Sequence, residues 1–200
     1  MNYRKGFGEI SNSDKTVLRE LGGQITKIAA SPINEEYAEL QRSINNLEMA
    51  KPLIYIYEIP WHEMNVNDEL TLRTHHPLCR RFEERLRRVI YKWRHGLGVL
   101  VDDPRFCSNI GLEPIVEQSL QDYVYDTGYG LPVQEDIVRV DDKNPVVSHR
   151  YHIQIRSEAD IDKIEMPKVF FDKEKAEEEF QKLCEIFDDI LDVEKRGVYS

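Results

Sequence analysis

The sequence is poor in cysteine and has no long apolar run, and each shortage excludes a class of protein. Its three cysteines, Cys79, Cys107 and Cys184, are scattered and form no CxxC pair, so they predict reduced thiols in the cytosol and no disulfide framework. No stretch approaches the ~20 apolar residues of a membrane span. The basic start, residues 1–9, precedes no apolar run of the kind found in signal peptides. We therefore expect a soluble, cytoplasmic protein.

Positive charge is also scarce. The 27 lysines and arginines against 37 aspartates and glutamates give a formal net charge of −10. Surfaces that bind nucleic acid or anionic membranes need clustered positive charge, so the sequence predicts neither partner. With 200 residues, of which 40% are hydrophobic, the chain suits one domain or a large fragment of one.

Residues 1–50 are expected to form a mobile leader, residues 1–12, followed by two amphipathic helices. Ser13 is a candidate cap for the first helix, which Gly22 and Gly23 are expected to interrupt. Ser31-Pro32 separates it from the second helix. The apolar positions that recur at helical spacing are Val17, Leu18, Leu21, Ile25 and Ile28, then Tyr37, Leu40, Ile44 and Leu47. We expect a helical hairpin that extends a single structural unit over residues 51–200.

That unit begins with the pattern of strand, helix and strand. Residues 53–57 form a continuous β-branched and aromatic run, typical of a strand buried on both faces, and residues 99–101 form a second such run. Between them, the helix that follows His76-Pro77 is apolar on one face and rich in arginine on the other. Its apolar residues are Leu78, Phe82, Leu86, Val89, Ile90 and Trp93. This order predicts parallel strands, with function at their carboxyl ends.

The alternation stops in residues 114–156. Segments 137–140 and 146–155 favour an antiparallel hairpin or meander. Ser157 with Asp160 resembles a capping box, and Asp172 is expected to cap a last helix. The buried side of that helix is predicted to hold Ala176, Phe180, Leu183 and Phe187. Residues 190–199 are predicted to form a third barrel strand.

Two groups of polar side chains follow the predicted strands and are candidate site residues. Trp61, His62 and Glu63 lie in the loop after the first strand, where they could bind a ligand or shuttle a proton. The alternative is a structural loop in which Trp61 is packed and His62 is hydrogen-bonded. Asp102 and Asp103 end the second strand and could act as acid, base or substrate anchor; alternatively they cap the next turn. Because both groups follow consecutive parallel strands, we expect them within ~10 Å of each other.

Other polar groups favour structural roles. His75, His76 and Cys79 have metal-type atoms but no second ligand cluster completes a tetrahedral site, and His76 is better placed to cap the helix that Pro77 begins. His149 and His152, three apart in a predicted strand, face opposite sides. The arginine-rich face of residues 80–92 is most simply a solvated face with ion pairs, or else a surface for an acidic partner. We expect no metal to be bound by this chain alone.

Five motifs follow one another along the chain: PWHEMN after the first strand, RRVIYKWRHGL in the following helix, DTGYG, VVSHRY and DIDKIEMPK. In this order, from about residue 14 to the end, they resemble the N-terminal half of a branch of the uroporphyrinogen-decarboxylase-like superfamily. Members of that branch are often associated with corrinoid-dependent methyl transfer. The resemblance implies a (β/α)8 barrel of the TIM type behind an N-terminal helical extension.

The resemblance also implies site residues and cofactors. In the decarboxylases an arginine-bearing loop follows the first strand and an aspartate ends the second. Here Asp102 or Asp103 matches the aspartate, whereas residues 60–65 contain no arginine, which argues against binding many porphyrin carboxylates. A corrinoid (cobalamin) is the implied cofactor. Zinc in the related methyltransferases is held by the later part of the barrel, so no zinc ligand is assigned in this chain.

Three functions follow as alternatives. The first is the N-terminal part of a corrinoid-linked methyltransferase, inactive alone, with a corrinoid protein or a small methyl donor or acceptor as partner. The second is a tetrapyrrole decarboxylase relative, and the third is a non-enzymatic binding or assembly chain. Three predicted barrel strands, 53–59, 99–102 and 190–199, cannot close a barrel. We therefore expect a truncated barrel that self-associates, pairs with a separate C-terminal half, or exposes apolar residues including Tyr55, Tyr57, Val198 and Tyr199.

Overall fold

The computed structural model describes residues 8–49, 51–52, 56, 59–96, 115–131, 133–139 and 147–197. Its α-helices are α1 (Asn12–Ala29), α2 (Ile33–Asn45), α3 (Pro77–Arg94) and α4 (Lys173–Phe187), and its short 3-10 helices are η1 (Leu120–Tyr123) and η2 (Glu158–Lys163). Its strands are β1 (Ile115–Ser119), β2 (Val124–Asp126), β3 (Glu135–Val138), β4 (Ser148–Tyr151), β5 (Val169–Phe171) and β6 (Asp192–Arg196). None of the described helices is long and apolar enough to cross a membrane.

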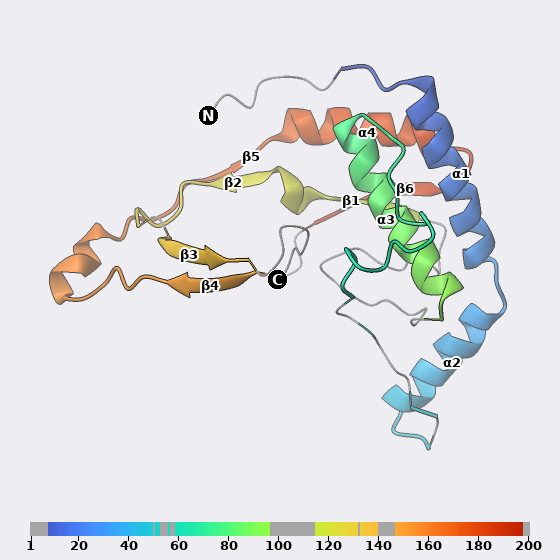
Figure 1. The fold of residues 1–200 in the computed structure, drawn as a ribbon, viewed down its shortest axis with the longest axis horizontal. Helices are drawn as coiled ribbons and strands as arrows, with labels where there is room; N and C mark the ends of the chain where they lie inside the picture. The colour runs from blue at the N-terminus through green and yellow to red at the C-terminus, as the bar shows by residue number, and fades with distance from the viewer. Residues whose placement is uncertain are drawn as a thin grey trace.

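The hydrophobic core lies where α1, α3 and α4 gather around the strand pair β1–β6 (Figure 1). The apolar faces predicted for these three helices point into it, although Val17, Val89, Trp93 and Phe180 are only partly buried. The buried cluster comprises Leu18, Leu21, Ile25, Ile28, Leu78, Cys79, Phe82, Leu86, Ile90, Val116, Leu183, Ile186, Phe187 and Leu191. Periodicity of 3.6 residues was therefore sufficient to predict which side of each helix is inside.

Helix α1 begins earlier than predicted and is not interrupted by its glycines. Ser11, and not Ser13, caps it: the Ser11 hydroxyl accepts a hydrogen bond from the Asp14 N–H at 3.1 Å. Gly22 lies against α4, where an added Cβ would come within 3.3 Å of Phe187 and Leu191, whereas an added Cβ at Gly23 would meet nothing within 4 Å. Close packing against α4 therefore explains Gly22, and the helix continues through both residues.

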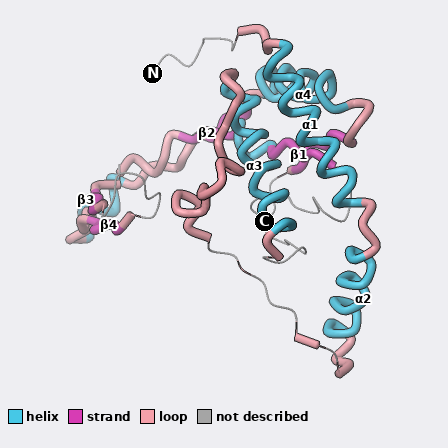
Figure 2. The backbone as a smooth tube through the Cα atoms, turned by 45° about the vertical axis from the view of Figure 1, so that its right-hand side comes forward, coloured by secondary structure: helices cyan, strands magenta, loops and turns pink. Residues whose placement is uncertain are grey.

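The predicted helical hairpin is wrong. Helix α2 leads away from the end of α1 instead of folding back along it (Figures 1 and 2). The apolar face of α1 is already covered by α3 and α4, so no surface on α1 remains for α2. Accordingly Tyr37, Leu40 and Ile44 are only half-buried and Leu47 is exposed. Amphipathic spacing predicted the helix but not its neighbour.

The described strands form three separate two-stranded sheets and no closed barrel. In the first sheet β1 and β6 are parallel, with Ile115 opposite Asp192 and Ser119 opposite Arg196. The strand predicted within 190–199 is confirmed, but its partner β1 belongs to the stretch predicted to be antiparallel. The predicted strand 99–102 lies outside the described residues, as does most of 53–59. The described architecture is thus mixed α/β.

The predicted antiparallel hairpin is confirmed, and a second antiparallel pair extends it toward the core. Strands β3 and β4 pair with Val138 opposite Ser148, and β2 pairs with β5 nearer the core. The capping box of Ser157 with Asp160 and the Asp172 cap of α4 are also present. Gly130 has a φ of +77° and its missing side chain makes room for the Lys163 carbonyl, which an added Cβ would approach to 2.9 Å. That close backbone approach requires glycine in the DTGYG turn.

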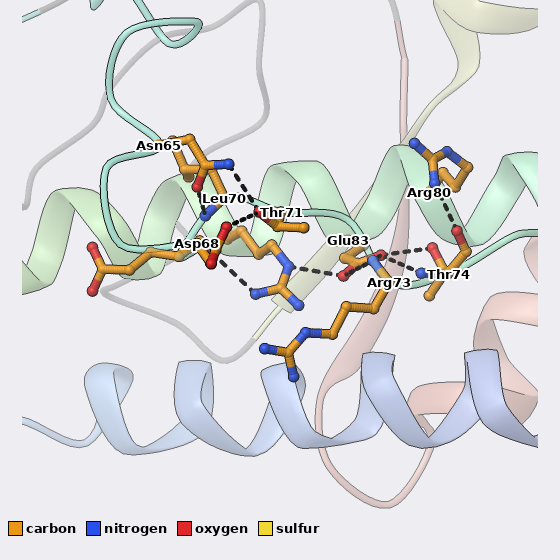
Figure 3. Close-up of polar contacts among 10 residues, drawn as sticks. Asn65, Asp68, Leu70, Thr71, Arg73, Thr74, Arg80 and Glu83 are labelled. Atoms are coloured by element: carbon orange, nitrogen blue, oxygen red, sulfur yellow. Dashed lines mark hydrogen bonds and ion pairs between the residues drawn. The ribbon is translucent and has the colours of Figure 1, made fainter.

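A buried carboxylate fixes the segment that precedes α3. Glu83 of α3 is fully buried, and its two oxygens accept hydrogen bonds from the Arg73 and Thr74 N–H groups, the Thr74 hydroxyl and Arg87 Nε, at 2.7–2.9 Å. Figure 3 shows the segment running beside α3 with Glu83 directed at Arg73 and Thr74. Burial by itself raises the pKa of Glu83, but the hydrogen bonds from Thr74, Arg73 and Arg87 outweigh it and leave the pKa below its ordinary value.

A second buried carboxylate ties the same segment to α1. Asp14 accepts hydrogen bonds from the His76 N–H at 2.8 Å and from the His75 N–H at 3.1 Å. Burial raises the pKa of Asp14, while these backbone donors and Ser11 lower it further than burial raises it. Residues 73–76 are therefore held between two helices by main-chain bonds to two carboxylates.

Replacing each of the two glycines of α1 by alanine should affect stability differently. Gly23→Ala should raise the free energy of unfolding by about 0.5–1 kcal/mol, because alanine favours helix and the site is open. Gly22→Ala should lose that gain, because its methyl group meets Phe187 and Leu191, both buried. Urea unfolding of both variants measures the difference. Equal stabilisation by the two would contradict the proposed contact between α1 and α4.

Replacing the buried carboxylate should be costly. Glu83→Gln offers one acceptor oxygen and turns an N–H2 group toward donors, so we expect a loss of about 3 kcal/mol at neutral pH. Glu84→Gln is the matched control: Glu84 is half-buried and pairs with Arg88 of the same helix, so its loss should stay below about 1 kcal/mol. Similar losses in the two variants would show that Glu83 does not fix the segment.

The difference in stability between the wild type and Glu83→Gln should depend on pH in one direction. Since the pKa of Glu83 is lowered in the folded state, its charge stabilises the fold fully above the ordinary glutamate pKa of about 4.3. That contribution is lost as the pH falls below this value toward the folded-state pKa. The stability gap between the wild type and Glu83→Gln should therefore narrow in acid.

Candidate functional site

The loop after residue 59 turns twice and places two of the predicted site residues together. The Glu63 N–H donates to the Pro60 carbonyl at 2.8 Å and the Met64 N–H donates to the Trp61 carbonyl at 3.3 Å. These tight turns present Trp61 and His62 toward α3, and both side chains are partly buried there. The position of this loop is therefore set by α3.

Trp61 and His62 line a hollow of about 400 Å³ between the loop and α3. Leu70 and Leu72 supply an apolar wall, while Asn65, Glu84 and Arg88 supply polar groups. Ligand pockets of this mixed kind usually have volumes of about 300–1,000 Å³. The hollow is thus of a size for a small molecule.

Two cations of α3 lie over the indole of Trp61. The Arg88 guanidinium is 5.1 Å from the ring centroid and Lys92 Nζ is 5.9 Å from it. Tyr91 meets the same indole edge-on at 5.9 Å. Cation–π contacts of this kind contribute about 0.5–1 kcal/mol at exposed sites. They hold the indole against α3 and place positive charge at the hollow.

His62 is the one predicted proton-transfer group that lines the hollow. Its Nε2 lies 3.3 Å from Glu63 Oε1, and its Nδ1 is buried without a hydrogen-bond partner among the described residues. Glu63 itself is exposed and does not line the hollow. Imidazole is the side chain that most often transfers protons in enzyme sites.

Hydrogen bonds within the loop keep the far wall of the hollow in place. Asn65 Oδ1 accepts from the Leu70 N–H at 3.0 Å, and Asn65 Nδ2 donates to the Thr71 hydroxyl at 2.8 Å (Figure 3). The Thr71 hydroxyl in turn donates to Asp68 at 3.0 Å. The wall formed by Leu70 and Leu72 is therefore continuous with the segment that Glu83 fixes.

The structure brings together only part of the predicted site. Trp61 and His62 line the hollow and Glu63 contacts His62, whereas Asp102 and Asp103 lie outside the described residues, so their predicted proximity to the loop stays a prediction. Sequence reasoning missed five lining residues: Asn65, Leu70, Leu72, Glu84 and Arg88. A signal for two of them was present, because Glu84 and Arg88 are four residues apart on the polar face of a predicted helix.

The arginine-rich face of α3 forms several ion pairs, as predicted. Arg87 and Arg88 each pair with a glutamate of the same helix, whereas Arg81 and Arg85 pair with carboxylates of other elements. The partners are Glu83 for Arg87, Glu84 for Arg88, Glu179 for Arg81 and Asp122 for Arg85. Part of this face is therefore buried against α4 and η1 and is not solvated throughout.

A second polar cluster lies inside the core and is closed to ligands. Tyr123 is buried; its hydroxyl donates to Glu179 at 2.6 Å and accepts from Gln118 at 2.6 Å, and Arg81 donates to Glu179 at 2.8 Å. Burial first, and then the Glu179 hydrogen bond, raise the pKa of Tyr123 to about 12. The cluster joins η1, α3 and α4 and has a structural role.

The histidines and Cys79 take the structural positions favoured above. His76 caps α3, accepting from the Leu78 N–H at 3.2 Å, and burial raises the pKa of Cys79 to about 12, which disfavours a thiolate ligand. His149 pairs with Glu135 and His152 with Asp136, on opposite faces of the hairpin. Among the residues that the structure describes, no three His, Cys, Asp or Glu side chains are grouped to hold a metal.

Comparison with known proteins adds no relative: no family model, no curated protein and no solved structure matches the chain.

The contact of Arg88 with Trp61 can be measured directly. In a Trp93→Phe background Trp61 is the one tryptophan left, and Arg88→Met should shift its emission and lower the free energy of unfolding by about 1 kcal/mol. Arg42→Met is the matched control, since Arg42 pairs with Glu35 on exposed α2 and lies in another element. An unchanged Trp61 spectrum in Arg88→Met would contradict the contact.

Proposed function

We propose that the chain binds a small methyl donor or acceptor in the hollow, as part of a uroporphyrinogen-decarboxylase-like methyltransferase acting with a corrinoid. The observation that supports it most is that Trp61 and His62, from the PWHEMN motif of the resemblance, line a hollow of about 400 Å³ together with Arg88. In this proposal the binding site therefore lies beside the loop of Trp61 and His62, which the sequence also indicates as a candidate site.

The lining residues would contact different parts of a ligand. Leu70 and Leu72 exclude water from an apolar part of the ligand, and Trp61 offers a flat aromatic surface. Arg88 and Glu84, which pair with each other, can each turn toward a ligand group of opposite charge. His62, beside Glu63, is placed to take a proton from an acceptor such as a thiol.

The described residues do not fit a corrinoid itself. A corrinoid supplies a transferable methyl group when bound, but its macrocycle and side chains exceed a hollow of about 400 Å³. In this proposal the corrinoid therefore stays on a separate corrinoid protein, and the hollow holds the small reactant alone.

A tetrapyrrole decarboxylase relative is the second candidate. The first loop lacks the arginine of the decarboxylases, but Arg88 of α3 brings a guanidinium to the same hollow and Lys92 lies near Trp61. These cations could contact a substrate carboxylate. The size of the hollow argues against a whole tetrapyrrole, so we rank this function below methyl transfer.

Ligand binding measured through Trp61 separates the two functions. In the Trp93→Phe background we expect saturable quenching of Trp61 by a small methylated amine, a methoxylated aromatic or a thiol, without turnover by this chain alone. His62→Gln or Arg88→Met should weaken binding about 10-fold, the loss expected for one polar contact, whereas Arg42→Met should not. Binding of uroporphyrinogen alone would favour the decarboxylase relative, and binding of no compound would reject the hollow as the site.

A further inference from the structure

Residues 124–131, 133–139 and 147–172 project away from the helices as a long antiparallel ribbon, and we call these residues the arm (Figures 1 and 2). The arm leaves the core at Tyr123 and returns at Asp172, whose N–H donates to the Tyr123 carbonyl at 3.0 Å. Further bonds join Thr127 to Lys168 and Tyr129 to Glu165, so the two halves stay paired outward from the core. This pairing directs the arm away from the body of its own chain.

The arm has no interior of its own. None of its described residues is buried, in contrast to the core around α1, α3 and α4. Its two sheets, β2–β5 and β3–β4, have two strands each, and an isolated two-stranded ribbon is at best marginally stable in water. The arm therefore needs a covering surface from outside.

Large apolar side chains are exposed on both faces of the arm. Tyr125 and Phe170 face each other across β2–β5 and are 46% and 56% exposed, and Ile137 and Tyr151 share one face of β3–β4. The others are Tyr129, Val133, Val138, Ile153, Ile155, Ile161, Ile164, Met166, Val169 and Phe171. A fully buried aromatic side chain covers about 150–250 Å², so the exposed apolar area of the arm is on the order of 1,000 Å².

We propose that the arm is a dimerisation surface and that a second copy of this chain covers it. Summed over both faces of the arm, the exposed apolar area is of the same order as the roughly 800 Å² that each partner contributes to a stable interface. Among the described residues each strand of β3–β4 has one unpaired edge, so the same ribbon on two chains can pair about a two-fold axis. The proposal does not depend on what the hollow binds.

The test is the mass of the full chain in solution, by light scattering and sedimentation equilibrium. We expect a dimer. Tyr125→Glu combined with Phe170→Lys replaces an aromatic pair by an opposite-charge pair at the same cross-strand position, so the ribbon stays paired while its apolar surface is lost. The dimer dissociation constant should rise by roughly 100-fold or more, because burial of two aromatic side chains is removed.

Val66→Glu is the matched control, since Val66 is 81% exposed and lies outside the arm; it should leave the dimer unchanged. A wild-type monomer, an open-ended larger assembly, or a dimer insensitive to the arm variant would each overturn the proposal. Should the variant fold poorly, wild-type hydrogen exchange still decides: amides of β3 and β4 should gain protection as the concentration rises, and concentration-independent exchange would overturn the proposal.

Discussion

The buried carboxylate of Glu83 is the interaction on which the candidate site depends. Segment 65–76 has no helix or strand, so its main-chain N–H groups need partners from elsewhere. Glu83 supplies them at Arg73 and Thr74, and Asp14 supplies them at His75 and His76. An irregular segment thereby has partners for its main-chain donors, as a strand in a sheet would. The hollow exists because this segment and α3 cannot move apart without breaking the hydrogen bonds to Glu83.

The two neighbouring ion pairs of α3 differ in how strongly they are held. Arg87 pairs with Glu83, while Glu84 and Arg88, each one residue further along the same helix, pair at the hollow. The inner pair is buried and fixed by several donors, whereas the outer pair is partly exposed and can exchange one partner for a ligand. One helix therefore serves both the core and the site.

Much of the body could be predicted from sequence because helix burial follows a simple period. The faces of α1, α3 and α4, the hairpin β3–β4 and the caps at His76, Ser157 and Asp172 were all predictable from local pattern. The parallel partner of β6 was not, since β1 contains Glu117 and Gln118 and lacks a continuous apolar run. The direction of α2 was not predictable either, because it depends on which helices already cover α1.

Only part of the candidate site could be predicted from the sequence. Trp61 and His62 stood out by residue type within one loop, but Arg88 and Glu84 reach the hollow through the packing of α3, which no local pattern encodes. Whether Asp102 and Asp103 join them stays a prediction. The relation to a methyltransferase barrel likewise stays a proposal, supported by the motifs and the hollow.

The most direct measurement of the central claim is hydrogen exchange at the Arg73 and Thr74 amides. If Glu83 fixes the segment, both amides should exchange as slowly as those in the middle of α3, through global unfolding only. Glu83→Gln should release them selectively while α3 stays protected. Rapid exchange of these two amides in the wild-type protein would show that the segment moves freely, and the account of the hollow as a preformed site would be wrong.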